Sequence, residues 1–325
     1  MIKFLLFQFK HELEDYEDYY DYVEKKIKVE LVSATGCNIL EMERSGSIFD
    51  LQIAVKEENF KVELNFRNEE HIQITVTVNK NDTYNKALED TKLALKDIFR
   101  PDFNQCIWLE DVQSNDLSFE LYNKVHIIEN KLRHFINLIL FNKLDNKWWD
   151  FIPKKIKDNH QKTFKSAKDI APCFNNINDY LLSIYSTDLG DILTLEIKKW
   201  EPNQDEFIEN LLVENNVNKN ANRVYEKLKE QLKTKMSFWD IYFKQYLSPN
   251  FMVNWNLFCV YRNHIAHNKL VNYSAFNEMN VLFNDLLKEL DSALSKVEDE
   301  IIEADFNLQI EDLNLLAEFL DGNIV

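Results

Sequence analysis

The sequence predicts an α+β protein, in which an N-terminal antiparallel β-sheet domain with one helix precedes an all-α helical bundle. Two changes of pattern carry this prediction. Apolar residues alternate with polar ones through about residue 78, as in strands with one buried face. From residue 119 onward they recur at spacings of three and four, as in amphipathic helices. The 325 residues, 45% of them hydrophobic, are enough to bury a full core.

The N-terminal part has the sequence of a β-meander followed by a helix. The opening segment, Ile2 to Lys10, is too short for a secretory leader and is interrupted by Gln8, so we expect a strand or a packing segment. Alternation predicts strands at 49–55, 60–66 and 72–78, with turns at 57–59 and 68–70 and further strands at 27–32 and 105–112. Asp82 or Thr83 is expected to cap a helix that ends near Phe99.

The rest of the chain is predicted to be helical. A long amphipathic helix begins near residue 119, and at its margin Glu129 and Arg133, one turn apart, are expected to form a half-buried ion pair. Further helices are predicted at 177–184, 188–200, 204–213, 222–235, 238–247 and 274–297, and Ser248-Pro249 is expected to open another. The predicted domains are therefore 1–118, 119–296 and an acidic amphipathic segment, 297–325, suited to docking on its own domain or on a partner.

Composition excludes several classes of function. With four glycines, the chain has no G-x-G-x-x-G and no G-x-x-x-x-G-K pattern, which excludes Rossmann dinucleotide binding and P-loop chemistry. The four cysteines lie far apart without C-x-x-C spacing, which argues against a zinc site and favours a cytoplasmic protein with reduced thiols. No apolar run approaches the roughly 18 residues of a membrane span. We expect no cofactor, no metal and no membrane association.

The formal net charge of −17 is unevenly distributed. Residues 1–118 hold 14 Lys and Arg against 24 Asp and Glu, residues 119–294 hold 23 against 22, and residues 295–325 hold 1 against 9. The middle part therefore contains the best candidate for a phosphate-contacting surface, a lysine-rich run. Its members are Lys154, Lys155, Lys157, Lys162 and Lys165. The alternative interpretation is a solvated helix face.

One segment has residue types that point to chemistry, the run Arg262-Asn263-His264-Ile265-Ala266-His267. The apolar turns at 251–259 predict a buried helix that ends in four polar side chains, and such a cluster is a site candidate.

In this run the chain resembles the HEPN superfamily, all-helical domains whose ribonuclease members carry Arg-x4-6-His, commonly Arg-Asn-x-x-x-His, late in the bundle. The resemblance covers about residues 119–296 and is closest to the abortive-infection and anti-phage branches. Glu129 and Arg133 are similar to a Glu-x-x-x-Arg pair in their opening helix, and 188–191 with Trp200 are similar to their Asp-rich turn and Trp. The resemblance implies a metal-independent endoribonuclease, a toxin or anti-phage effector, whose cleft forms between two protomers of a homodimer.

The residue types fit this chemistry, because RNA can be cleaved by its own 2′-hydroxyl. His267 is assigned as general acid or base, since histidine exchanges protons near neutral pH, and Arg262 as the clamp on the phosphate. Asn263 is expected to orient one of them or the substrate. His264 is either a second proton-transfer group or a hydrogen-bonded structural histidine. Five helical positions place Arg262 and His267 about 140° apart, so a two-fold dimer is needed to bring both to one phosphate.

Two other interpretations of this region are open. In the first, the domain is a non-catalytic HEPN dimerisation module that binds RNA or a partner protein. In the second, His264 and His267 hold a metal ion, with Glu129 or His126 as a further ligand. A DNA-binding regulator is disfavoured, because the chain lacks a helix-turn-helix pattern and a strongly basic domain. An active nuclease needs restraint, so residues 1–118 are expected to sense a phage-derived trigger or mask the cleft, and an antitoxin is a further expected partner.

Overall fold

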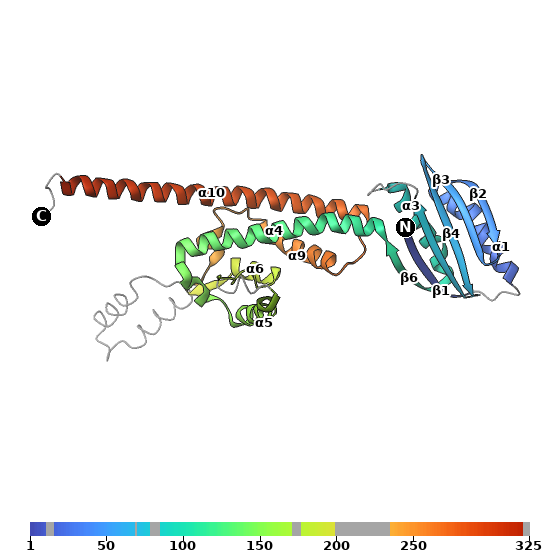
Figure 1. The fold of residues 1–325 in the computed structure, drawn as a ribbon, viewed down its shortest axis with the longest axis horizontal. Coiled ribbons are helices and arrows are strands. Elements are labelled where there is room, and N and C mark those ends of the chain that lie inside the picture. Colours follow the sequence, from blue (N-terminus) through green and yellow to red (C-terminus); the bar gives the residue numbers. More distant parts are fainter. Residues whose placement is uncertain (11–15, 69, 79–84, 171–176, 199–234, 321–325) are drawn as a thin grey trace, which may run out of the picture. The chain divides into compact units, whose positions relative to one another are not determined.

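The computed structural model describes residues 1–10, 16–68, 70–78, 85–170, 177–198 and 235–320. It is an α+β protein with an antiparallel sheet in its N-terminal part and helices in its C-terminal part (Figure 1). The chain divides into two compact units, Met1–Asn123 with Arg262–Asn280, and Lys124–Tyr261 with Val281–Val325. None of the described helices is long and apolar enough to cross a membrane.

The first unit contains a six-stranded sheet in the order β2-β3-β4-β5-β1-β6, with every neighbouring pair antiparallel. Its strands are β1 (Ile2–Phe9), β2 (Asn38–Ser45), β3 (Ile48–Val55), β4 (Glu58–Asn68), β5 (His71–Val78) and β6 (Phe103–Asp111). The predicted alternation is confirmed: Leu51 lies opposite Val62, and Leu64 opposite Ile74, all of them buried. The strand β2, an edge strand with mostly exposed side chains, was not predicted.

Helices cover one face of this sheet (Figure 1). They are α1 (Tyr16–Lys26), the π-helical turn η1 (Ile27–Leu31), α2 (Val32–Thr35) and α3 (Lys86–Phe99), which leads into the short helix η2 (Arg100–Asp102). The predicted strand at 27–32 is wrong, because Ile27 and Leu31 continue the buried face that Tyr19 and Val23 form in α1. The cap of α3 is Asn85, whose side chain accepts from the Leu88 N–H (3.0 Å), and not Asp82 or Thr83.

The second unit is mostly helical. Its elements are the main part of α4 (Val112–Leu144), then η3 (Asp145–Phe151), α5 (Lys154–Ile170), α6 (Ser186–Leu193), the strand pair β7 (Glu196–Lys198) and β8 (Lys235–Ser237), the π-helical turn η5 (Trp239–Phe243), most of α9 (Phe251–Ala266) and most of α10 (Tyr273–Leu320). Its core is built from Phe135, Trp148, Phe243, Phe251, Trp255, Phe258 and Phe283, all nearly inaccessible to solvent.

Several predicted boundaries in this part change. The helix predicted at 177–184 is not formed, since this segment has a turn at 180–183 between irregular residues. The helix predicted at 188–200 is α6, which ends at Leu193. The helix predicted at 238–247 is the single turn η5 with the turns that follow it. The helix α4 starts seven residues earlier than expected, and α10 continues to Leu320 instead of ending near 297. The predicted helix at 204–213 and nearly all of that at 222–235 lie outside the described residues.

Candidate active site

The run from Arg262 to His267 forms the C-terminal turns of α9. Buried Phe251, Trp255 and Phe258 fix the preceding turns, as the sequence predicts. Asn268 ends the helix with a left-handed backbone (φ 50°), its N–H donates to the Ile265 carbonyl (3.0 Å), and the Lys269 N–H donates to the His264 carbonyl (3.2 Å). This is a Schellman end with asparagine at the position usually held by glycine. His267 is therefore the exposed C-cap residue.

The polar side chains of the run differ in their surroundings. The Arg262 guanidinium donates to the Asn263 side-chain oxygen at 3.3 Å, so Asn263 orients Arg262 locally. The Nε2 atom of His264 lies 3.0 Å from the carbonyl of Leu270. Because a carbonyl only accepts, Nε2 carries the proton, and Nδ1 is the nitrogen through which His264 would exchange one. This contact gives His264 a structural role in closing the 264–270 loop.

The loop after the run is fastened to the sheet-containing unit by two buried polar side chains. The Val271 N–H donates to the Ser114 hydroxyl (2.7 Å), and the Tyr273 N–H donates to the Glu89 carboxylate (2.8 Å). Ser114 and Glu89 are 2% and 8% exposed, so both hydrogen bonds are shielded from water. Sequence reasoning missed both residues, which hold the segment that follows His267.

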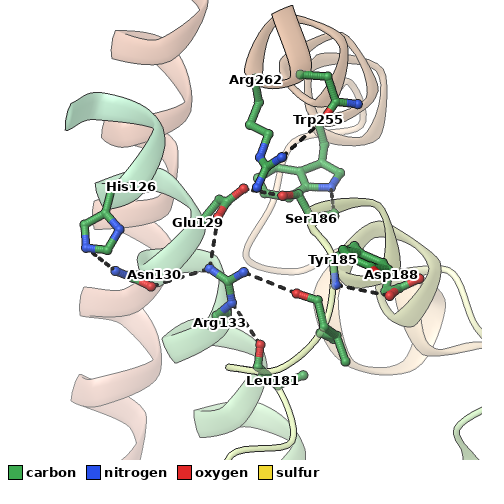
Figure 2. A network of polar contacts seen from close by, with 12 residues as sticks. His126, Glu129, Asn130, Arg133, Leu181, Tyr185, Ser186, Asp188, Trp255 and Arg262 are labelled. Atoms are coloured by element: carbon green, nitrogen blue, oxygen red, sulfur yellow. Dashed lines mark hydrogen bonds and ion pairs between the residues drawn. The ribbon is translucent and has the colours of Figure 1, made fainter. Parts of the chain in front are cut away.

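Glu129 and Arg133 form the expected pair on α4, and it is more buried than expected. Arg133 Nη1 lies 3.3 Å from Glu129 Oε2, with 12% and 11% of the side chains exposed. Arg133 also donates to the carbonyls of Leu181 (2.9 Å) and Ile184 (3.5 Å), and the Ser186 hydroxyl donates to Glu129 (Figure 2). The pair thus connects α4 to the turns before α6.

The residues of the expected Asp-rich turn have local partners. Asp188 accepts from the backbone N–H of Tyr185 (3.1 Å) at the start of α6 and from the Asn159 amide of α5 (3.1 and 3.3 Å). The indole N–H of Trp255 donates to the Ser186 carbonyl at 3.2 Å (Figure 2). Trp200, the other residue of the resemblance, lies outside the described residues.

Gly190 is fitted against this tryptophan, since an added Cβ would lie 2.9 Å from Trp255 Cδ1. We expect Gly190→Ala to lower the free energy of unfolding by about 1–2 kcal/mol, because the overpacking penalty exceeds the gain in helix propensity. Urea denaturation measures the change, with the exposed neighbour Asp191→Ala as control, expected within about 0.5 kcal/mol of the parent. A Gly190→Ala protein as stable as the parent would contradict this close packing.

The lysines of α5 lie along one helix face. Lys154, Lys155 and Lys162 are exposed and Lys157 is half-buried, while Ile156 on the opposite face is buried. Lys155 lies 3.6 Å from Asp191, and Lys157 donates to the Asp150 carbonyl (3.2 Å). The side chain of Lys165 lies outside the described part of α5, although helix geometry places its position between those of Lys154 and Lys162.

No group of three or more His, Cys, Asp or Glu side chains able to hold a metal ion occurs among the residues described. Comparison with protein-family models, with curated proteins and with solved structures finds no match to this chain.

Proposed function

We propose that this chain is a metal-independent endoribonuclease of the HEPN type, with its catalytic groups in the run from Arg262 to His267. The observation that carries the proposal is the position of this run. The run lies at the end of a helix whose preceding turns are buried, and its last residue, His267, is exposed. Hydrogen bonds to Glu89 and Ser114 hold the loop that follows. A fixed backbone that presents an exposed proton-transfer group is what such catalysis requires.

The reaction uses the 2′-hydroxyl of the RNA as nucleophile. Its oxygen bonds to the adjacent phosphorus, the bond to the 5′-oxygen of the next nucleotide breaks, and the products end in a 2′,3′-cyclic phosphate and a 5′-hydroxyl. His267 takes the proton of the 2′-hydroxyl or gives one to the leaving 5′-oxygen. Arg262, oriented by Asn263, donates to the non-bridging oxygens, where negative charge develops.

The proposed active form is a homodimer, because residues five positions apart on one helix point about 140° away from each other. Two copies related by a two-fold axis would place Arg262 of one protomer beside His267 of the other. The exposed lysines of α5 are proposed to contact the RNA backbone, a contact that weakens with salt. A toxin or anti-phage effector is the proposed biological role, restrained by an antitoxin or released by a phage-derived trigger.

Substitution of Arg262 tests the proposal. Arg262→Ala is expected to slow cleavage of a mixed RNA pool in EDTA by about 10²- to 10³-fold, as on loss of one donor to a developing oxyanion. Arg262→Lys keeps the positive charge but not the planar guanidinium, so its cleavage rate should fall less than that of Arg262→Ala. Equal rates for parent and both variants would contradict the assignment and favour a non-catalytic dimerisation module.

A further inference from the structure

The two edges of the six-stranded sheet differ in how they are protected. The strand β2 forms one edge and β6 forms the other (Figure 1). In β2, the charged residues Glu41, Glu43 and Arg44 and a register shift after Ile39 protect the edge against a further strand. In β6, the stretch from Phe103 to Leu109 contains no charged residue and no proline. The β6 edge therefore lacks the features that prevent strand addition.

The outer side of β6 has no strand partner in the described part of the chain. Its pairing with β1 keeps one register from Phe103 to Trp108. Just before this stretch, the Lys10 N–H donates to the Asp102 carbonyl (2.9 Å), so the backbone groups at position 102 point toward β1. Because consecutive residues of a strand direct these groups to opposite sides, those of Gln105 and Ile107 point away from β1. They form a row of donors and acceptors along the edge.

Contacts of Trp108 hold this edge strand in place. Its ring stacks on that of Phe4, with centroids 4.9 Å apart and 6° between the planes, and its indole N–H donates to the Asp111 carboxylate (3.2 Å). Asp111 in turn forms an ion pair with Lys92 of α3 at 2.7 Å, with 3% and 4% of the two side chains exposed. A strand fixed in this way needs little further ordering to accept another one.

The sheet face opposite the helices is apolar beside this edge. Phe4 and Leu6 are buried under the helices, so alternation places Leu5 and Phe7 on the opposite face, where both are half-buried. Ile107 lies opposite Leu5 in the register and is 44% exposed. Alternate side chains of an added strand would cover Ile107, as Leu5 does from the other side.

Charge and backbone together distinguish between possible occupants. Residues 1–118 hold 14 Lys and Arg against 24 Asp and Glu, so two copies of the sheet brought edge to edge would repel each other. A segment with a net positive charge would be attracted. A helix satisfies its own backbone groups, so a row of unpaired N–H and C=O groups selects an extended segment.

We propose that the β6 edge from Phe103 to Leu109 is the docking site for an extended, net basic segment of a partner protein, which adds a strand to the sheet. Backbone hydrogen bonds to Gln105 and Ile107 hold the segment, and its apolar residues, at alternate positions, cover Ile107. This site is separate from the proposed nuclease chemistry, so either proposal can fail without the other.

The test uses the full chain and a labelled peptide in which valines alternate with threonines between terminal lysines. Fluorescence anisotropy measures its affinity, which should fall when glutamates replace the terminal lysines. Two further peptides carry N-methyl groups, one on the valines and the other on the threonines. In an added strand only alternate amides face β6, so only one of these two peptides should lose affinity, by about tenfold or more.

A matched pair of variants tests the edge from the side of the protein. Gln105→Pro removes an N–H that points away from β1, so it should preserve the fold, shown by an unchanged circular dichroism spectrum, and reduce the affinity about tenfold or more. Gln105→Ala keeps this N–H and should bind within about threefold of the parent.

Equal affinities of the two methylated peptides, which need no change to the protein, would overturn the proposal. Equal affinities of Gln105→Pro and Gln105→Ala, or binding of the glutamate-ended peptide as tight as that of the lysine-ended one, would do the same. A homodimer that Gln105→Pro dissociates in analytical ultracentrifugation would also contradict it, because a second copy would then occupy this edge.

Discussion

Arg133→Ala is expected to lower the free energy of unfolding by about 3–5 kcal/mol. The substitution removes the ion pair with the Glu129 carboxylate, which is 11% exposed, and the donors to the Leu181 and Ile184 carbonyls. Removing one partner of a buried ion pair costs far more than the pair itself contributes. The turns before α6 should loosen with it, because Arg133 binds two of their carbonyls to α4.

Lys131→Ala is the matched control, a cation on the same helix two residues earlier. Its ion pair with Asp291 is solvent-exposed, with 32% and 56% of the side chains accessible, so its loss should cost no more than about 1 kcal/mol. Urea denaturation followed by circular dichroism gives both values. Similar small losses for the two variants would show that the Glu129–Arg133 pair is not held away from water. The double change Glu129→Met with Arg133→Met should recover much of the loss.

The sequence predicted the parts of the fold that depend on local periodicity. Strands β3 to β5 follow from period-two alternation, and the Glu129–Arg133 pair follows from a spacing of four on a helix. The segment 27–31 was misassigned because Ile27, Val29 and Leu31 alternate as in a strand, while Ile27 and Leu31 alone also fit the helical spacing of four. Tertiary burial against the sheet selects the helical one, in which Val29 is exposed.

The surroundings of the candidate site could not be predicted in the same way. The residues that fasten the loop after His267 bond to backbone N–H groups far along the chain: Ser114 is 157 residues from Val271, and Glu89 is 184 residues from Tyr273. No local sequence pattern predicts such a contact, because any backbone N–H is an equivalent donor. For His264 the sequence left two roles open, a second proton-transfer group or a hydrogen-bonded structural histidine. The contact with Leu270 depends on the path of the 264–270 loop, which no local pattern predicts.

His267→Ala is expected to slow RNA cleavage by about 10²- to 10⁴-fold, the usual contribution of a general acid or base. The residue is an exposed helix cap, so its removal should leave the fold intact, which circular dichroism checks. His134→Ala, at an exposed histidine on α4, is the control of the same residue type and should cleave at the parent rate. His264→Ala removes the hydrogen bond to Leu270 and should have a smaller effect, through the position of the loop.

The most direct measurement maps the RNA ends produced by the parent protein and by His267→Ala, with EDTA present throughout. We expect the parent to yield 2′,3′-cyclic phosphate and 5′-hydroxyl ends, and the variant to yield almost none above the protein-free background. Cleavage that EDTA abolishes, or that His267→Ala leaves unchanged, would contradict a metal-independent centre in the run from Arg262 to His267.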